Sequence, residues 1–208
     1  MPRGRHAPPL EVRQDRQRGR LFAAAAAVFA RLGYADATAE AIAREAGMSK
    51  ATFYEHFADK EECIVALFDA GVQTLLHNMR TAVAEHADSD TATRVRTTLE
   101  AFLGTLARYP DQSQTLLVEI VGAGPRAMER RDRALDAVAT YIYELNRESA
   151  ERGRSPRLAS FHDAYAITGA VVELASRQIR TGVPADIRDL EPVVERLVLG
   201  LLASGDRP

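Results

Sequence analysis

Residues 38–57, with the sequence TAEAIAREAGMSKATFYEHF, decide the fold of the first part of this chain. Thr38 and Ser49 are residue types that cap helix N-termini, and each precedes a short helix-forming segment. Gly47 lies between the two segments and permits a turn in which two helices cross steeply without a Cβ clash. The stretch therefore predicts a helix-turn-helix, with short helices over about residues 39–46 and 50–57.

The second of these helices has one apolar face and one polar face. Phe53 and Phe57 are four residues apart, so they share a face and are expected to be buried. The residues expected to project outward are Lys50, Ala51, Thr52, Tyr54 and His56. That outward face is free to enter a DNA major groove. Short helix pairs joined at glycine also occur as packing units that do not bind DNA. In that alternative Tyr54 and His56 pack against the rest of the domain, and Thr38 and Ser49 serve only as helix caps.

The rest of the chain also has apolar residues at helical spacing. A helix is expected from Leu21 to Leu32, before Gly33, and Asp59 with Glu62 forms an Asp-x-x-Glu capping box that opens a long helix to about His86. Further helices are expected over 95–108, 113–121, 125–152, 158–180 and 190–204, with Pro110 ending the first of these. No stretch alternates with a period of two, so the fold class is all-α, with about nine helices.

Composition excludes several classes of protein. The 208 residues are 46% hydrophobic and 27% charged, which fits one or two globular domains. The longest apolar run, residues 21–30, is half of what a bilayer span needs and is mostly alanine. The single cysteine, Cys63, forms neither an internal disulfide nor a thiolate metal cage. We expect a cytoplasmic protein with no membrane partner, no bound metal and no cofactor.

The two parts of the chain carry opposite charge. Residues 1–60 contain ten Lys and Arg against seven Asp and Glu, whereas the remainder contains 17 against 22. The first twenty residues hold six arginines: Arg3, Arg5, Arg13, Arg16, Arg18 and Arg20. Residues 1–15 include three prolines and no apolar periodicity, so they are expected to be a flexible basic arm. Such an arm is typical of a nucleic-acid-binding terminus, and a solvated tail has the same composition.

The segment from Gly33 to Glu61 resembles the N-terminal domain of TetR-family transcriptional regulators. The residues that carry the resemblance are Gly33-Tyr34, Thr38, Ile42-Ala43, Ala46 to Lys50, Thr52 to Tyr54, His56-Phe57 and Asp59 to Glu61. The resemblance implies a DNA-binding domain over 16–62 and a helical effector-binding and dimerisation domain over 63–208. It further implies a homodimer that binds a palindromic operator in double-stranded DNA. The regulator would be a repressor, and a small-molecule effector would release it from the operator.

The resemblance also implies roles for individual residues. Residues 49–57 become the recognition helix, with Lys50, Ala51 and Thr52 near base edges. The residues near phosphates would be Tyr54, His56 and Lys60. Thr38 begins the helix before the recognition helix, where its cap and the exposed backbone amides can also meet a phosphate, and Ser49 begins the recognition helix itself. Lys60 opposes the dipole of the helix it begins, which favours a phosphate there. Ala51 stands where glycine is common in the family, so its methyl group alters the reading face.

The C-terminal part offers candidate effector contacts and a candidate dimer interface. The candidate effector-binding residues are Phe102, Gln112, Glu119, Tyr141, His162 and Tyr165, which lie in segments that otherwise look buried. Polar residues at such positions more often lie on a solvated face. The apolar stripes over 167–175 and 193–201 fit either a four-helix bundle between two chains or the core of one chain.

Enzyme motifs are not found in the sequence. None of the five histidines belongs to a Glu-x-x-His or His-Glu-x-x-His motif, and there is no Gly-x-Ser-x-Gly or P-loop. We therefore expect no catalytic site. The alternative is a helical small-molecule-binding or catalytic module whose helix-turn-helix does not bind DNA.

Overall fold

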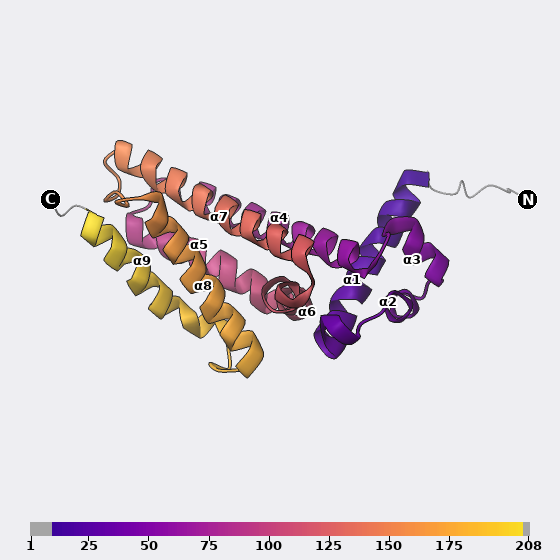
Figure 1. Ribbon diagram of the computed structural model, residues 1–208. Helices are drawn as coiled ribbons and strands as arrows, with labels where there is room; N and C mark the ends of the chain where they lie inside the picture. The colour runs from indigo at the N-terminus through magenta and orange to yellow at the C-terminus, as the bar shows by residue number, and fades with distance from the viewer. Residues whose placement is uncertain (1–9, 206–208) are drawn as a thin grey trace, which may run out of the picture.

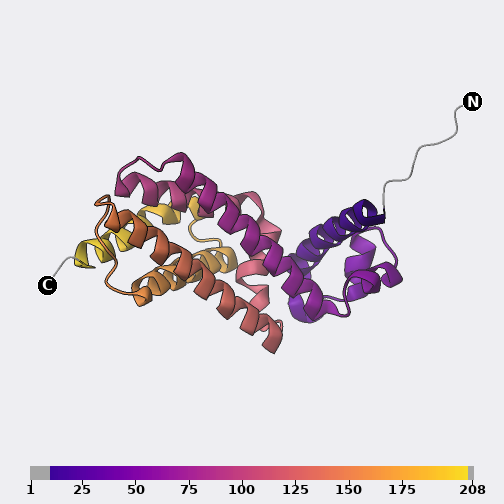
Figure 2. The ribbon, with the colours of Figure 1, turned by 90° about the horizontal axis from the view of Figure 1, so that it is seen from above.

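The computed structural model describes residues 10–205, and all of its regular elements in this range are helices (Figure 1). The predicted all-α class is confirmed. A small group of helices, which we call the head, comprises α1 (Leu10–Asp36), α2 (Ala39–Glu45) and α3 (Lys50–His56). The head lies at one end of a longer helical body, and α9 ends at the opposite end of the molecule (Figures 1 and 2).

The body consists of the remaining helices. They are α4 (Lys60–Glu85), α5 (Thr91–Arg108), α6 (Pro110–Leu117), the 3₁₀ turn η1 (Glu119–Gly122), α7 (Pro125–Glu151), α8 (Phe161–Thr181), the 3₁₀ turn η2 (Ile187–Leu190) and α9 (Glu191–Gly205). Helix α4 begins at the head and runs along the body, where it packs beside α5 and α7 (Figure 2). Helix α8 packs on α7, and α9 packs on α5 and α8. None of the helices described is long and apolar enough to cross a membrane.

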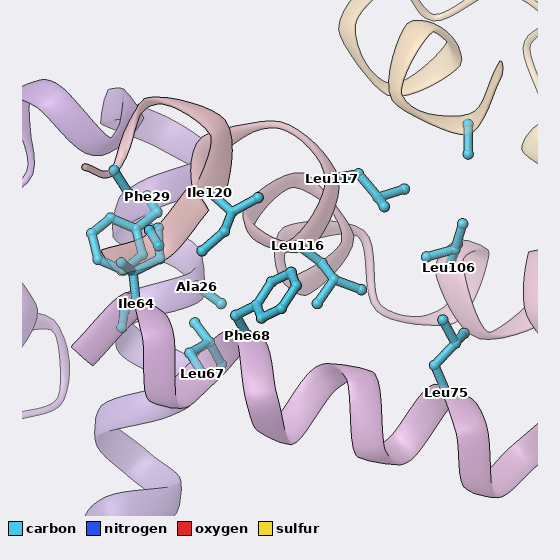
Figure 3. Close-up of a cluster of buried hydrophobic side chains, with 14 of the residues drawn as sticks. Ala26, Phe29, Ile64, Leu67, Phe68, Leu75, Leu106, Leu116, Leu117 and Ile120 are labelled. Atoms are coloured by element: carbon cyan, nitrogen blue, oxygen red, sulfur yellow. The ribbon is translucent and has the colours of Figure 1, made fainter. Parts of the chain in front are cut away.

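A continuous apolar core joins the head to the body (Figure 3). Ala26 and Phe29 of α1 face Ile64 and Leu67 of α4, and all four are buried. Ile120 of η1 closes the cluster from the other side and has no exposed surface. Because these buried side chains come from the head, α4 and the α6–η1 segment, the position of the head depends on how those elements pack.

Helix α1 begins earlier than the sequence predicts. Residues 10–15 are helical, so the flexible arm predicted over residues 1–15 is wrong for that part, and residues 1–9 of the arm, with Arg3 and Arg5, lie outside the described residues. The segment LEVRQDRQRGR consists mostly of good helix formers and has Glu11 in its first turn. An exposed helical extension of a buried helix needs no apolar stripe, which is why the periodicity criterion missed it.

Three further boundaries differ for local reasons. Helix α5 starts at Thr91 because the Asp90 carboxylate accepts the Thr93 N–H at 2.9 Å. Pro110 ends α5 as predicted, and it also occupies the first position of α6, where its fixed φ favours a helix start. Helix α8 starts at Phe161 rather than near 158, since the Asp163 carboxylate accepts the Ser160 N–H at 2.8 Å.

Candidate nucleic-acid interface and ligand cavity

Both predicted helix caps of the helix-turn-helix are confirmed. The Thr38 hydroxyl accepts the Ala41 N–H at 3.0 Å, and the Ser49 hydroxyl accepts the Thr52 N–H at 3.0 Å. Gly47 joins α2 to the loop before α3 with φ +64°, the left-handed conformation for which glycine was expected. These local contacts fix where α3 begins and how steeply it leaves α2.

Helix α3 is held by its aromatic residues and exposes its polar ones. Phe53 has no exposed surface, and its ring centroid lies 5.4 Å from that of the buried Phe57. Tyr54, by contrast, is 50% exposed. The other predicted contact residues on this segment are also accessible: Ser49, Lys50 and Ala51 are exposed, and Thr52 and His56 are half-buried. The structure thus brings the predicted recognition residues onto one accessible face of α3.

Three arginines of α1 form a stripe beside this face. Arg13, Arg16 and Arg20 are spaced i, i+3 and i+7, so they project from one side of the helix. The Arg20 Nη2 donates to the Ala46 carbonyl at 2.6 Å, which places this side of α1 against the turn between α2 and α3. Arg18 lies on another side, where its guanidinium is 5.1 Å from the centroid of Phe57. At Arg20 the stripe reaches the turn that precedes α3, so it adds positive charge to the head on the side of this turn.

Lys60 has partners that the sequence analysis did not anticipate. Its ammonium donates to the carbonyls of Tyr34 at 2.7 Å, Ala35 at 3.0 Å and Ala37 at 2.9 Å. The same ammonium lies 4.4 Å from the Tyr34 ring centroid. The dipole argument for a phosphate at Lys60 is therefore wrong, because the carbonyls at the end of α1 already compensate for this cation. We assign Lys60 a structural role at the junction between α4 and the head.

Glu119 connects the body to the head. One carboxylate oxygen accepts the backbone N–H of Tyr34 at 2.7 Å, and the other accepts the Gln114 side-chain amide at 2.8 Å. Tyr34 follows Gly33, whose φ of +75° kinks the end of α1. The contact therefore joins the kinked end of the head to η1, which follows α6.

The body contains an apolar cavity between α4, α5, α7 and α8. Its walls include Phe68, Leu75, Leu99 and Val138, and α6 and α9 also contribute side chains. The cavity has a volume of about 180 Å³. A largely apolar cavity with a few polar groups is typical of a small-molecule site.

Two of the six candidate effector residues line this cavity. Phe102 and Tyr141 do so, and burial raises the pKa of the Tyr141 hydroxyl, against the opposing effect of Arg80 and Arg94. The other four, Gln112, Glu119, His162 and Tyr165, are not part of its wall. Glu119 is used at the contact with the head, and His162 and Tyr165 lie on the exposed side of α8. For these four, apolar neighbours in sequence did not indicate the direction of the side chain.

The apolar stripes of α8 and α9 are divided between core and surface. Ile167, Ala175 and Val194 are buried within the chain, and Val198 lines the cavity. Val193 is 45% exposed. Part of the predicted dimerisation stripe is therefore the core of one chain, and the outer part is available for contact.

Comparison with known proteins agrees with this geometry. The family model for bacterial regulatory proteins of the tetR family matches residues 21–67, which include α2, α3 and the start of α4. Residues 21–67, which include most of the head and the start of α4, are therefore a tetR-family domain. A curated relative, the HTH-type transcriptional activator FasR of Mycolicibacterium smegmatis, is 34% identical over 106 residues. That match covers 51% of this chain and 47% of FasR, so the chain matches about half the length of its relative.

Solved structures share the fold over nearly the whole chain. The fatty acid degradation regulator FadR from Bacillus halodurans has a TM-score of 0.77 at 19% identity, covering 94% of this chain and 97% of FadR. FadR from Bacillus subtilis, in complex with stearoyl-CoA, has a TM-score of 0.76 at 18% identity, covering 91% of this chain and 99% of that one. The head and body of this protein therefore share the fold of those structures.

Proposed function

We propose that this protein is a ligand-responsive transcriptional regulator that binds DNA through α3 and binds its effector in the body cavity. The observation that carries the proposal is the accessible polar face of α3, held in place by the buried Phe53 and Phe57. A helix presented in this way by a helix-turn-helix enters the major groove with its N-terminal residues at base edges.

In this proposal each residue of the face has a chemical role. Lys50 and Thr52 donate to base acceptors, and the Ala51 methyl group packs against base edges. Tyr54 and His56 contact phosphates, which position the helix without reading sequence. Thr38 and Ser49 remain caps, and the exposed starts of their helices favour a nearby phosphate. The arginine stripe of α1 adds contacts along the DNA backbone.

We further propose that the protein acts as a homodimer on a palindromic operator. The exposed outer residues of α8 and α9, such as Val193, support an interface between two copies. A two-fold dimer requires half-sites separated by about one helical turn of DNA or a multiple of it. Residues 16–62 would then form the DNA-binding domain and residues 63–208 the dimerisation and effector-binding domain.

The effector we propose is a molecule with a long aliphatic chain. The apolar wall of the cavity supports this, and the structurally similar FadR of Bacillus subtilis is seen with stearoyl-CoA. The effector changes DNA affinity only if it binds better to one spacing of the two heads than to the other. We propose that it favours the spacing that does not fit DNA, which makes the protein a repressor. FasR is named an activator, so a promoter-fusion assay decides the direction of regulation.

The test is binding of the purified protein to the DNA that flanks its own gene. Fluorescence anisotropy across a salt series, with non-specific competitor, should detect one competitor-resistant site. Lys50→Ala with Tyr54→Ala should abolish this binding while the circular dichroism spectrum stays unchanged. The matched control is Tyr165→Ala, since Tyr165 is 38% exposed on the body. Unchanged binding by the double variant would refute the assignment of α3, and no site even after random-sequence selection would favour a head that does not bind DNA.

A further inference from the structure

The cavity of the body has polar groups mainly at the end away from the head. Thr91 and Arg94 lie in the first turn of α5, and Asn146 and Ser149 lie in the last turns of α7. Both helix ends are at the far end of the body (Figure 1). The loop after α7 closes over this end, because the Thr91 hydroxyl donates to the Arg154 carbonyl at 2.8 Å. The opposite end, near the head, is lined by apolar residues of α4 and α6.

Most polar side chains in the cavity wall already have partners within the chain. The Thr98 hydroxyl donates to the Arg94 carbonyl at 2.8 Å, and the Thr168 hydroxyl donates to the Ala164 carbonyl at 2.9 Å. The Asn146 side chain donates to the Pro156 carbonyl at 3.0 Å and accepts the Leu158 N–H at 2.9 Å. These groups stabilise the wall and have little left to offer a ligand.

Arg94 is different. Its Nη1 donates to the Ser149 hydroxyl at 2.7 Å, but its Nε is buried and has no hydrogen-bond partner within residues 10–205. No carboxylate in that range forms an ion pair with Arg94, whereas Arg96 on the outer side of α5 pairs with Glu195 at 2.9 Å. The side-on edge of the Arg94 guanidinium, formed by Nε and Nη2, is therefore left without an anion.

An unpaired cation in an apolar wall is costly unless an anion completes it. A planar carboxylate fits the side-on edge of a guanidinium with two parallel hydrogen bonds. We propose that the cavity binds a long-chain free carboxylic acid, with its carboxylate on Arg94 and its aliphatic chain running toward Phe68 and Leu116. This inference rests on the proposed function, because it takes the cavity to be the effector site.

The dimensions of the site and the Arg94 guanidinium favour a free acid over an acyl-CoA. From Phe68 to Val83, α4 lines the cavity over about 22 Å, which accommodates an extended aliphatic chain. At this end of the cavity Ser149 is 4% exposed and Leu158 is 2% exposed, and Arg94 itself is half-buried. A carboxylate directly on the chain fits the unpartnered edge of Arg94. A thioester carbonyl carries no charge, and the phosphates of coenzyme A lie far from it beyond a bulky linker.

A second cation provides the matched control. Arg131 of α7 also lines the cavity, and it has Asp132 at 3.9 Å. If Arg131 rather than Arg94 bound the ligand carboxylate, the aliphatic chain would run through the cavity in the opposite direction. The variants Arg94→Met and Arg131→Met keep an aliphatic side chain of similar reach and remove one charge each. Arg94→Met loses one hydrogen bond, from Nη1 to Ser149, so this variant should stay folded and melt slightly below the unchanged protein.

The experiment is isothermal titration calorimetry of the full chain with stearic acid, octadecanol and stearoyl-CoA. We expect the acid to bind about tenfold or more tightly than the alcohol, as a hydrogen-bonded charge pair predicts. Arg94→Met should remove this preference without weakening the alcohol, Arg94→Lys should restore part of it, and Arg131→Met should retain it. Equal affinities for acid and alcohol, or loss of the preference in Arg131→Met, would overturn the proposal.

Two outcomes separate this inference from the proposed function. If stearoyl-CoA alone binds and Arg94→Met does not affect it, the free-acid proposal is wrong and the ligand-responsive regulator stands. If none of the three compounds binds while the specific DNA complex still forms, the cavity is not a site for long aliphatic chains. The free-acid proposal is then wrong as well, and DNA binding through α3 is unaffected.

Discussion

The joint between head and body should depend on the Glu119 carboxylate. Its two oxygens accept the Tyr34 backbone N–H at 2.7 Å and the Gln114 side-chain amide at 2.8 Å. Glu119→Ala removes both acceptors at once. The Tyr34 N–H lies at the kinked end of α1 and is partly buried, so water replaces the carboxylate only in part.

The expected loss of stability follows from these two hydrogen bonds. A hydrogen bond to a charged group contributes about 1.5–3 kcal/mol, and an unsatisfied buried donor costs about 1–3 kcal/mol. Glu119 is half-buried, so some solvent compensation applies and a total of about 2 kcal/mol is expected. In a chain of this length, that corresponds to a melting temperature lowered by about 4–8 °C.

Thermal unfolding followed by circular dichroism measures the change, with Glu119→Gln as the matched control. The amide oxygen of the new side chain still accepts the Tyr34 N–H. Gln114 can rotate its own amide so that its oxygen accepts from the new NH₂ group. Glu119→Gln should therefore melt within a degree or two of the unchanged protein, by the same conversion of about 2–4 °C per kcal/mol. If Glu119→Ala melts at the same temperature as Glu119→Gln, the stabilising role assigned to Glu119 is refuted, because its hydrogen bonds would then not stabilise the joint between head and body.

Three other substitutions or conditions test the head. Arg13→Ala with Arg16→Ala should flatten the dependence of log K for DNA binding on log salt by about 0.9 per lost phosphate contact, and Arg157→Ala at the far end of the body should leave that slope unchanged. Lys60→Met should destabilise the protein by about 1.5–3 kcal/mol through its lost carbonyl contacts while leaving the salt slope unaltered; a flatter slope would restore the phosphate role. Burial raises the pKa of the Cys63 thiol to about 12, so a disulfide reagent at pH 8 should react only after unfolding. Since the folded state favours the protonated thiol, the free energy of unfolding should fall as pH rises above the unfolded thiol pKa of about 8.5.

The helix-turn-helix was predictable because its determinants are local. The Thr38 and Ser49 hydroxyls each accept an N–H three residues ahead, and Phe53 and Phe57 are one turn apart. Contacts within four residues are encoded in a short stretch of sequence, so spacing alone locates them. The start of α5 has a local determinant of the same kind, because the Asp90 side chain caps it by accepting the Thr93 N–H.

Contacts between distant segments were not predictable from the same signals. Lys60 donates to a carbonyl 26 residues away, and nothing in its neighbourhood in sequence indicates that partner. The cavity draws its wall from several helices, so no single segment indicates it. One signal for Arg94 did exist: it precedes Thr98 and Phe102 by four and eight residues, which places a charge on the apolar stripe of α5.

Helix α6 links the ligand cavity to the head. Leu116 and Leu117 line the cavity, and the Leu117 carbonyl accepts the Ser176 hydroxyl of α8 at 3.2 Å. Two residues later, Glu119 holds the end of α1 (Figure 3 shows the packing around this segment). Close-packed interiors shift between discrete arrangements rather than deform continuously, so a ligand that displaces Leu116 must move α6 as a unit. The free energy for moving the head is then limited to the difference in ligand affinity between the two positions of α6.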